Sequence, residues 1–246
     1  MKLGILLAGR VNETLVDRVG EVDTMFEALY RSVDPTIELQ TWAVLDNRFP
    51  ATPRDADAWL VTGSKFGVYD ELPWIDPLKG FLRDARAARV PMIGICFGHQ
   101  LMAEAFGGRA EKFRNGWGVG IHRYKRQENV SWMDGAIPLF DMHAMHQDQV
   151  TALPDDATVL ASSSFCNYAM LSYGDPESPD AISIQPHPEF SNDYASGLLD
   201  LRGGTSIPED TTAAARASLG APTHGADFAA WSIAYLTSAL ARRAAA

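Results

Sequence analysis

Hydrophobic residues in the first half of the chain alternate between short continuous runs and positions spaced as on one face of a helix. The run Leu3–Ala8 predicts a buried strand, and the apolar residues spaced along Thr14–Tyr30 predict a helix. Strands that alternate with helices indicate an α/β fold whose parallel sheet is covered on both faces. The same patterns predict further strands at Ile37–Val44, Ala58–Val61 and Pro91–Cys96, and helices from Asp76 to about Arg89 and at Phe97–Phe106.

The pattern changes in the second half of the chain. Short β-like segments occupy residues 117–173, among them Gly118–Tyr124 and Thr158–Ala161, and a further core strand follows at Ala181–Gln185. No internal repeat or clear linker divides the chain. The remainder is predicted to be helical, with one helix at Asp193–Arg202, a second opened by Ser206–Glu209 and a third from about Asp227.

Two local signals predict where helices begin. Asp76 followed by Pro77 is typical of an N-cap with proline at the first helical position. Ser206 and Glu209 have the spacing of a capping box, in which each side chain accepts a backbone N–H of the first turn. Both are predictions about helix ends, and neither bears on function.

The charge and the lengths of the apolar stretches argue against some classes of binding partner. The chain has 246 residues, of which 46% are hydrophobic, and 31 acidic against 21 basic residues give it a formal net charge of −10. Nucleic acid and anionic membrane surfaces are disfavoured as partners, because phosphate binding needs clustered Lys and Arg. The apolar stretches between Lys2 and Arg10 and at Phe228–Ala241 are too short for a signal peptide or a bilayer span. We therefore expect a cytoplasmic protein that does not enter membranes.

The sharpest chemical signal is Gly94-Ile-Cys96-Phe-Gly98, which stands between a predicted strand and a predicted helix. A nucleophile elbow has this layout, because a tight strand-to-helix turn requires glycine on both sides of the reactive residue. Cys96 would face the positive end of the helix dipole, which favours the thiolate. The ordinary alternative is a small buried residue at a strand end, because cysteine is among the most buried residue types.

A partner for such a thiol follows the strand at Ala181–Gln185. Pro186 and Pro188 hold the segment extended, so that His187 and Glu189 point the same way and the carboxylate can orient the imidazole. An isolated His-x-Glu is most often a surface pair. At the carboxyl end of a parallel strand it is better placed for function, because ligands bind in that crevice.

Two other interpretations of residues in this part of the chain remain open. His143 and His146, three residues apart, could form a metal site with Asp148, His187 and Glu189. Cys166, the second cysteine, is interpreted as a buried structural thiol. Two cysteines are too few for a disulfide framework.

The order of the three candidate residues, Cys96, His187 and Glu189, distinguishes between families. In dienelactone-hydrolase-like proteins, which share the G-x-C-x-G elbow, the acid precedes the histidine on a separate loop. The sequence instead resembles the class I glutamine amidotransferase family, whose hallmarks are a G-x-C-x-G-x-Q elbow and a late H-P-E. These are present as Gly94–Gln100 and His187–Glu189, although Pro186 replaces the aromatic residue that often precedes H-P-E.

The resemblance implies a flavodoxin-like three-layer α/β sandwich with a mostly parallel central sheet. Residues 1–200 would form the catalytic domain, and residues 201–246 a helical C-terminal extension packed on it. Cys96, His187 and Glu189 would be the catalytic residues. By the same resemblance, the backbone N–H groups of Gly63 and Phe97 would form the oxyanion hole, and the substrate-binding residues would be Gln100, His146, Gln147 and Asp148.

The expected reaction is attack by Cys96 on the γ-carbonyl of glutamine or of a γ-glutamyl compound, through a γ-glutamyl thioester and without a cofactor or metal. Only about 46 residues follow the glutaminase-like region, too few for a synthase domain, which favours a free-standing γ-glutamyl hydrolase or glutaminase. Two alternatives are a glutaminase subunit that is inactive without a separate synthase partner, and a regulatory protein that binds a γ-glutamyl ligand without turnover.

Overall fold

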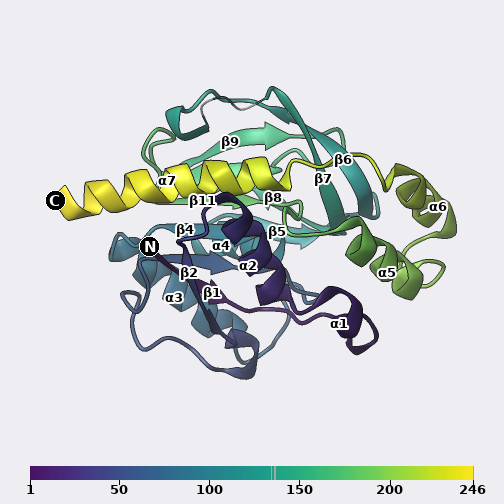
Figure 1. Cartoon of the computed structure of the whole chain (residues 1–246), viewed down its shortest axis with the longest axis horizontal. Coiled ribbons are helices and arrows are strands. Elements are labelled where there is room, and N and C mark those ends of the chain that lie inside the picture. Colours follow the sequence, from purple (N-terminus) through teal and green to yellow (C-terminus); the bar gives the residue numbers. More distant parts are fainter. Residues whose placement is uncertain (134, 136, 246) are drawn as a thin grey trace.

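The computed structural model describes residues 1–133, 135 and 137–245. Its elements succeed one another largely as the hydrophobic pattern predicts (Figure 1). The strands are β1 (Lys2–Leu6), β2 (Glu38–Trp42), β3 (Ala58–Val61), β4 (Met92–Ile95), β5 (Arg109–Lys112), β6 (Gly118–Arg126), β7 (Leu139–His146), β8 (Asp148–Ala152), β9 (Ala157–Ser162), β10 (Met170–Tyr173) and β11 (Ala181–Ile184). The helices are α1 (Glu13–Val19), α2 (Val22–Val33), α3 (Ile75–Ala87), α4 (Phe97–Ala105), α5 (Asn192–Arg202), α6 (Glu209–Ser218) and α7 (Gly225–Ala245), with short 3-10 turns at Val44–Asp46 and Ser131–Met133.

The main sheet has the strand order β2-β1-β3-β4-β11-β10-β9-β6-β7. The block from β2 to β11 is parallel throughout, and its order corresponds to the 2-1-3-4-5 arrangement of flavodoxin-like sheets. From β10 to β7 the pairings are antiparallel, so most of the short β-like segments of the second half extend the same sheet. β8 instead pairs with β5 in a separate two-stranded antiparallel sheet. The α/β class and the parallel core predicted from the sequence are therefore confirmed.

Helices cover both faces of this sheet, which gives the predicted three layers. Successive residues of a strand point to opposite faces. In β4, Ile93 belongs to the core cluster that includes residues of α2, α5 and α7, whereas Met92 belongs to the one that includes residues of α3 and α4. Figure 1 shows α7 crossing the molecule beside α2, with the N- and C-termini at the same side. None of the helices that the structure describes is long and apolar enough to cross a membrane.

Three sequence predictions about helix ends are wrong. The helix predicted over Thr14–Tyr30 is two helices, because Gly20 adopts φ 78° and its N–H closes α1. α3 begins at Ile75, so Asp76 lies inside the first turn rather than at the N-cap, which is Trp74. The N-cap of α6 is Pro208 with no side-chain hydrogen bond, so Ser206 and Glu209 form no capping box.

Candidate active site

Cys96 occupies the turn between β4 and α4 in a backbone conformation that residues other than glycine seldom adopt. Its φ is 52° and its ψ is −99°, which costs on the order of 1–3 kcal/mol and is typical of functional turns. Both flanking glycines are required by close packing. A Cβ on Gly94 would lie 2.6 Å from the carbonyl oxygen of Gly98, and one on Gly98 would lie 2.4 Å from that of Val61.

The sheet brings the H-P-E segment to this elbow. β4 and β11 are adjacent and parallel, with Ile95 opposite Ile184, and the backbone N–H of Cys96 donates to the carbonyl of Ile184 at 2.9 Å. His187 follows three residues later, and its backbone N–H donates to the carbonyl of His143 on β7 at 2.8 Å. The backbone of His187 is therefore held between the end of β11 and β7, with which it forms an antiparallel bridge.

His187 and Glu189 form a buried pair. Nδ1 of His187 lies 2.8 Å from Oε1 of Glu189, and the two side chains are 6% and 1% exposed. Burial disfavours the charged imidazole, but the carboxylate of Glu189 and the sulfur of Cys96 outweigh that effect and raise the pKa of His187. The imidazole is thus kept in its proton-donating form at neutral pH, with its orientation fixed by the carboxylate.

Two aromatic side chains complete the support of the imidazole. The ring of Phe190 is stacked on that of His187, with centroids 3.9 Å apart and planes at 18°, and Tyr194 packs edge-on against Phe190 at 4.6 Å. Neither residue was singled out from the sequence, although Phe190 directly follows H-P-E and Tyr194 lies one helical turn beyond it.

Gly63 lies against both members of the Cys96–His187 pair. A Cβ at this position would be 2.8 Å from Cε1 of His187 and 3.7 Å from Cβ of Cys96. Phe97 is the first residue of α4, where helical N–H groups have no partner within the helix. The structure therefore brings Gly63, Cys96, Phe97, His187 and Glu189 into one cluster. The oxyanion-hole role of Gly63 and Phe97 stays a prediction.

Three of the four predicted substrate-binding residues, Gln100, His146 and Asp148, meet at the backbone carbonyl of Asp148, and Gln147 lies beside them in the chain. Nε2 of Gln100 donates to that carbonyl at 2.9 Å and to Oε1 of Gln185 at 3.1 Å, and Nδ1 of His146 lies 3.1 Å from it. Nε2 of Gln147 donates to the carbonyl of Phe113 at 3.4 Å. In this structure the side chains of Gln100, His146 and Gln147 hold the start of β8 in place beside the elbow.

The carboxylate of Asp148 is also engaged. Its Oδ2 accepts a hydrogen bond from the hydroxyl of Tyr69 at 2.8 Å, and burial raises the pKa of Asp148 against the opposing effect of this bond. Tyr69 is 51% exposed, so it covers these residues from the solvent side. This contact was not predicted, because nothing in the sequence near Tyr69 indicates contact with residue 148.

The metal site considered from the sequence is not formed. Among the residues that the structure describes, no group of three or more His, Cys, Asp and Glu side chains is arranged to hold a metal ion. His143 instead packs toward Phe190, with ring centroids 6.4 Å apart, and Nδ1 of His146 faces a backbone carbonyl. Cys166 is buried and free, and burial raises the pKa of its thiol to about 12.

A cleft of about 670 Å³ opens on the His187 side of the elbow. Its walls come from segments far apart in the sequence, namely the loop after β1, the loop after β3, the H-P-E segment and α5. Gly63, His187 and Glu189 line it, whereas none of the four predicted substrate-binding residues does. The cluster around Cys96 and His187 thus borders both the Asp148 group and the cleft.

A sequence profile described as glutamine amidotransferase class I matches residues 48–197. The chain belongs to this family. The match includes the elbow and H-P-E, and it extends from the loop before β3 into α5.

Two relatives of this chain within the class I glutamine amidotransferase family have names that describe different activities. The chain is 30% identical to gamma-glutamyl peptidase 3 of Arabidopsis thaliana over 166 residues, which cover 64% of this chain and 65% of that relative, just under two thirds of its length. It is also 30% identical to one subunit of the glutamine-hydrolyzing GMP synthase of Halobacterium salinarum, over 72% of this chain and 88% of that protein. A solved glutamine amidotransferase from Methylobacillus flagellatus shares the fold, with a TM-score of 0.71 at 20% identity over 97% of this chain and 94% of that one.

Gly63 gives a test of the packing around His187. In Gly63→Ala the new methyl group would displace a ring that Glu189 and Phe190 hold in place, so we expect kcat to fall by about 100-fold with the fold retained. The matched control is Gly80→Ala on α3, where a Cβ meets nothing within 4 Å. Unchanged kcat in Gly63→Ala, measured beside this control, would contradict the geometry.

The buried histidines of this chain predict loss of stability in acid. Burial lowers the pKa of His99 and His146 to about 3 and that of His143 to about 4, whereas in the unfolded chain all three titrate near 6.5. Between these values only the unfolded state takes up the three protons, so the free energy of unfolding should fall by about 4 kcal/mol per pH unit as the pH drops from 6 to 5. Between pH 6 and 5 His187 is protonated in both the folded and the unfolded chain, so it adds nothing to this slope.

Urea unfolding followed by circular dichroism at pH 7, 6 and 5 measures this dependence. A flat free energy of unfolding over that range would show that the three histidines take up protons in the folded state.

Proposed function

We propose that this chain is a cysteine hydrolase that cleaves the γ-amide bond of glutamine or of a γ-glutamyl compound. The observation that carries the proposal is the buried pair of His187 and Glu189, with Nδ1 and Oε1 2.8 Å apart, aligned beside Cys96 at a strained strand-to-helix turn. A nucleophile, a base within reach and a group that orients the base are the parts that acyl transfer through a thioester requires.

The first half-reaction forms the acyl-enzyme. Sγ of Cys96, whose proton is held by His187, attacks the γ-carbonyl carbon, and the negative charge that develops on the carbonyl oxygen is met by the backbone N–H groups of Gly63 and Phe97. His187 donates its proton to the leaving nitrogen as the carbon–nitrogen bond breaks, which leaves a γ-glutamyl thioester on Cys96 and a free amine. Glu189 holds the imidazole in the required orientation.

The second half-reaction releases glutamate. His187, now neutral, accepts a proton from a water molecule whose oxygen attacks the thioester carbon. The carbon–sulfur bond then breaks, so that glutamate leaves with a γ-carboxylic acid group that loses its proton to solvent, and the Cys96 sulfur and the protonated His187 are regenerated. In this scheme the acyl group occupies the side of Gln100, His146, Gln147 and Asp148, because the leaving amine must lie on the His187 side.

The test is glutamate release by the purified protein from glutamine and from a panel of γ-glutamyl dipeptides, with Cys96→Ala as the control. Release from the dipeptides, lost in Cys96→Ala, supports a free-standing γ-glutamyl hydrolase, and release from glutamine alone supports an ammonia-producing glutaminase. No release from any compound contradicts a free-standing hydrolase.

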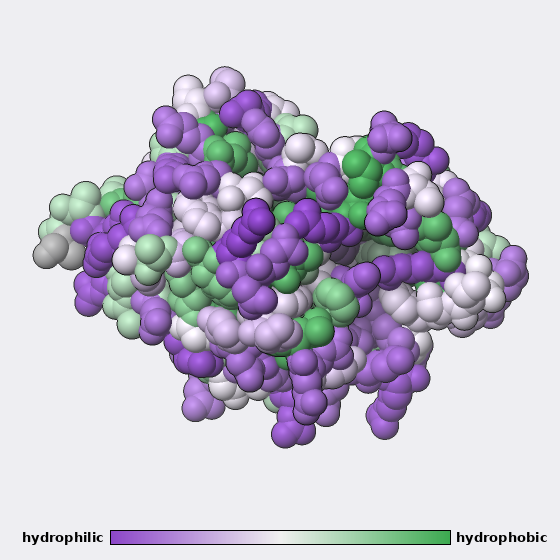
Figure 2. Space-filling view, turned by 90° about the horizontal axis from the view of Figure 1, so that it is seen from below, coloured by the Kyte–Doolittle hydropathy of each residue, from purple (hydrophilic) through white to green (hydrophobic). Residues whose placement is uncertain are grey.

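A second candidate is a glutaminase subunit that delivers ammonia to a separate synthase, which the likeness to one subunit of a GMP synthase favours. Such a protein should present an apolar docking surface near the mouth of its site. On the face shown in Figure 2, hydrophobic residues form small groups separated by hydrophilic ones. A glutaminase activity that appears only on addition of a synthase would identify this second candidate.

A further inference from the structure

The N-terminus of α7 packs directly against the backbone of the H-P-E segment. Gly225, the first residue of α7, is buried, and a Cβ there would lie 2.2 Å from the carbonyl oxygen of Pro188 and 3.1 Å from its carbonyl carbon. Pro188 joins His187 to Glu189, so the contact falls on the backbone that links the two members of the buried pair. Only glycine allows a helix to approach another backbone this closely.

The start of α7 is fixed by hydrogen bonds to β7. The backbone N–H of His224 donates to the carbonyl of Asp141 at 2.9 Å, and Nδ1 of His224 accepts the backbone N–H of Asp141 at 2.9 Å. Two residues further along β7, the carbonyl of His143 accepts the backbone N–H of His187 at 2.8 Å. The edge of β7 therefore holds both sides of the contact between α7 and the H-P-E segment.

α7 is also bound to the chain at the start of β4 and β11, the strands that lead to Cys96 and to the H-P-E segment. The hydroxyl of Tyr235 donates to the carbonyl of Asp180, just before β11, at 2.8 Å, and it accepts the backbone N–H of Met92, the first residue of β4, at 3.3 Å. Ten residues of helix from Gly225 to Tyr235 extend about 15 Å, and the four residues of β11 extend about 13 Å. One helix thus spans β11 from the residue before it to the segment after it.

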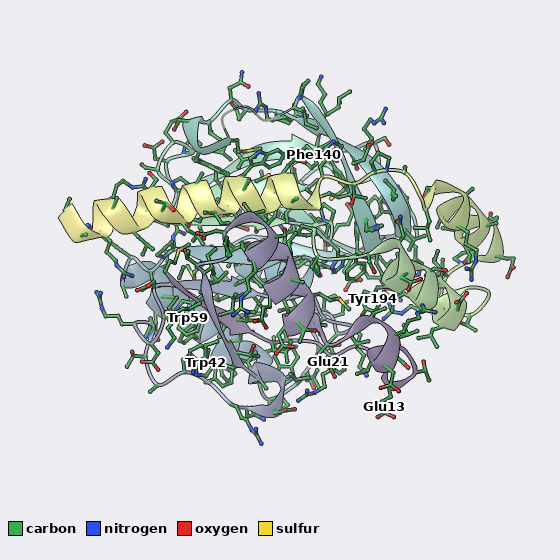
Figure 3. The ribbon with its side chains drawn as sticks, viewed as in Figure 1. Glu13, Glu21, Trp42, Trp59, Phe140 and Tyr194 are labelled. Carbon is green, nitrogen blue, oxygen red and sulfur yellow. The ribbon has the colours of Figure 1, made fainter. Side chains whose placement is uncertain are left out.

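Two large apolar side chains anchor the first turns of α7. Phe228 is fully buried, and Trp231 packs edge-on against Phe140 of β7, with ring centroids 5.5 Å apart. Figure 3 shows Phe140 beside this part of α7. A group added at Gly225 therefore displaces the carbonyl of Pro188 rather than the helix.

We propose that α7 positions the imidazole of His187, because Gly225 fixes the backbone of Pro188 and thereby the hydrogen bond between His187 and Glu189. Gly225 is a positioning residue, since it acts through Pro188. The proposal gives a part in the site to a helix beyond residues 48–197. It rests on the proposed function for its effect on turnover, whereas the geometry of the pair can be measured without substrate.

The first readout is the proton on Nδ1 of His187, which faces Oε1 of Glu189 at 2.8 Å. A proton in a short charge-assisted hydrogen bond gives an NMR signal far downfield of the other protons of a protein. We expect this signal in the wild type without substrate, and its absence from His187→Ala assigns it. In Gly225→Ala it should move upfield or disappear.

The second readout is the division of the kinetic effect between kcat and KM. In Gly225→Ala we expect kcat for the best γ-glutamyl substrate to fall by about 100-fold, because small displacements of a reacting group have effects of this size. KM should stay within about 3-fold of the wild type. A folded Gly225→Ala protein with an unchanged downfield signal and unchanged kcat would overturn the proposal.

Two controls separate positioning from a general loss of stability. Gly80→Ala adds the same methyl group to a helical glycine where a Cβ meets nothing within 4 Å. Leu236→Ala removes a fully buried side chain of α7 three turns away from Gly225, so it should lower the thermal unfolding temperature. Both variants should keep the downfield signal and kcat. Loss of the signal in folded Leu236→Ala to the same extent as in Gly225→Ala would show a merely structural role.

His224 provides a second test if Gly225→Ala does not fold. His224→Ala removes the acceptor of the Asp141 backbone N–H and loosens the start of α7, whereas His224→Asn keeps an acceptor oxygen near the position of Nδ1. We expect a weakened downfield signal and about 10-fold lower kcat in His224→Ala, and values near the wild type in His224→Asn. Equal signals and equal kcat in the two variants would overturn the proposal. If the wild type cleaves no γ-glutamyl compound, the proposed function fails, and the proton signal alone decides whether α7 positions His187.

Discussion

Cys96→Ala is expected to lower kcat/KM for the best γ-glutamyl substrate by about 10⁴-fold or more, because loss of the nucleophile removes the covalent route altogether. The side chain is small, buried and free of disulfides, so its replacement should leave the thermal unfolding temperature close to that of the wild type. Glutamate release under saturating and limiting substrate, together with a melting curve, measures both parts.

Cys166→Ala is the matched control, because Cys166 is also buried and free but plays no part in the proposed reaction. Its kcat/KM should stay within a factor of a few of the wild type. Full activity in Cys96→Ala, or comparable losses in both variants, would contradict the mechanism.

His187→Ala should be nearly as damaging, with kcat lowered by about 10³–10⁴-fold, because no other side chain would protonate the leaving amine or activate water. In Glu189→Gln the fall in kcat should be roughly 10-fold to 100-fold smaller than in His187→Ala, because the side chain of Glu189 orients the imidazole and transfers no proton itself. Kinetic measurements on the two variants, each checked for folding by circular dichroism, give this ranking.

A pH profile separates orientation by Glu189 from a merely structural role. The carboxylate of Glu189 helps to raise the pKa of His187, so its removal should make the imidazole lose its proton at lower pH. The acylation step needs the protonated ring, and the alkaline limb of kcat/KM should therefore move to lower pH in Glu189→Gln. An unmoved limb would show that Glu189 does not act on the charge of His187.

The geometry of the elbow could be predicted because it is encoded over a few adjacent residues. Gly94 and Gly98 mark the turn, since backbone atoms come so close there that a Cβ could not be placed. His187 and Glu189 are two residues apart in an extended segment, and the parallel pairing of β11 with β4 brings them to Cys96. Local sequence and one topological rule were sufficient for this part.

The cleft could not be predicted, because its walls meet only in the folded chain. Lys65 follows β3 and Arg202 ends α5, and nothing in the sequence near either residue indicates a shared cavity. The predicted capping box at Ser206 failed for a related reason. The chain loops back there, with the N–H groups of Ser206 and Ile207 bonded to the carbonyl of Arg202, and α6 starts only after Pro208.

The role of the group around Asp148 also depends on contacts between distant residues. Gln100 is placed by its position one turn into α4, but its donors are taken up by the carbonyl of Asp148 and by the side chain of Gln185. A family motif indicates that such a residue matters near the substrate. The hydrogen bonds show that it also builds the wall on which the acyl group would rest.

The most direct test of the central claim is to trap the acyl-enzyme. Wild-type protein is mixed with a γ-glutamyl dipeptide, quenched in acid within the first turnovers and analysed by intact mass and peptide mapping. The mechanism predicts an adduct of one glutamyl group, located on Cys96 and absent from Cys96→Ala. Turnover that continues with no adduct on Cys96, or with the glutamyl group on another residue, would contradict it.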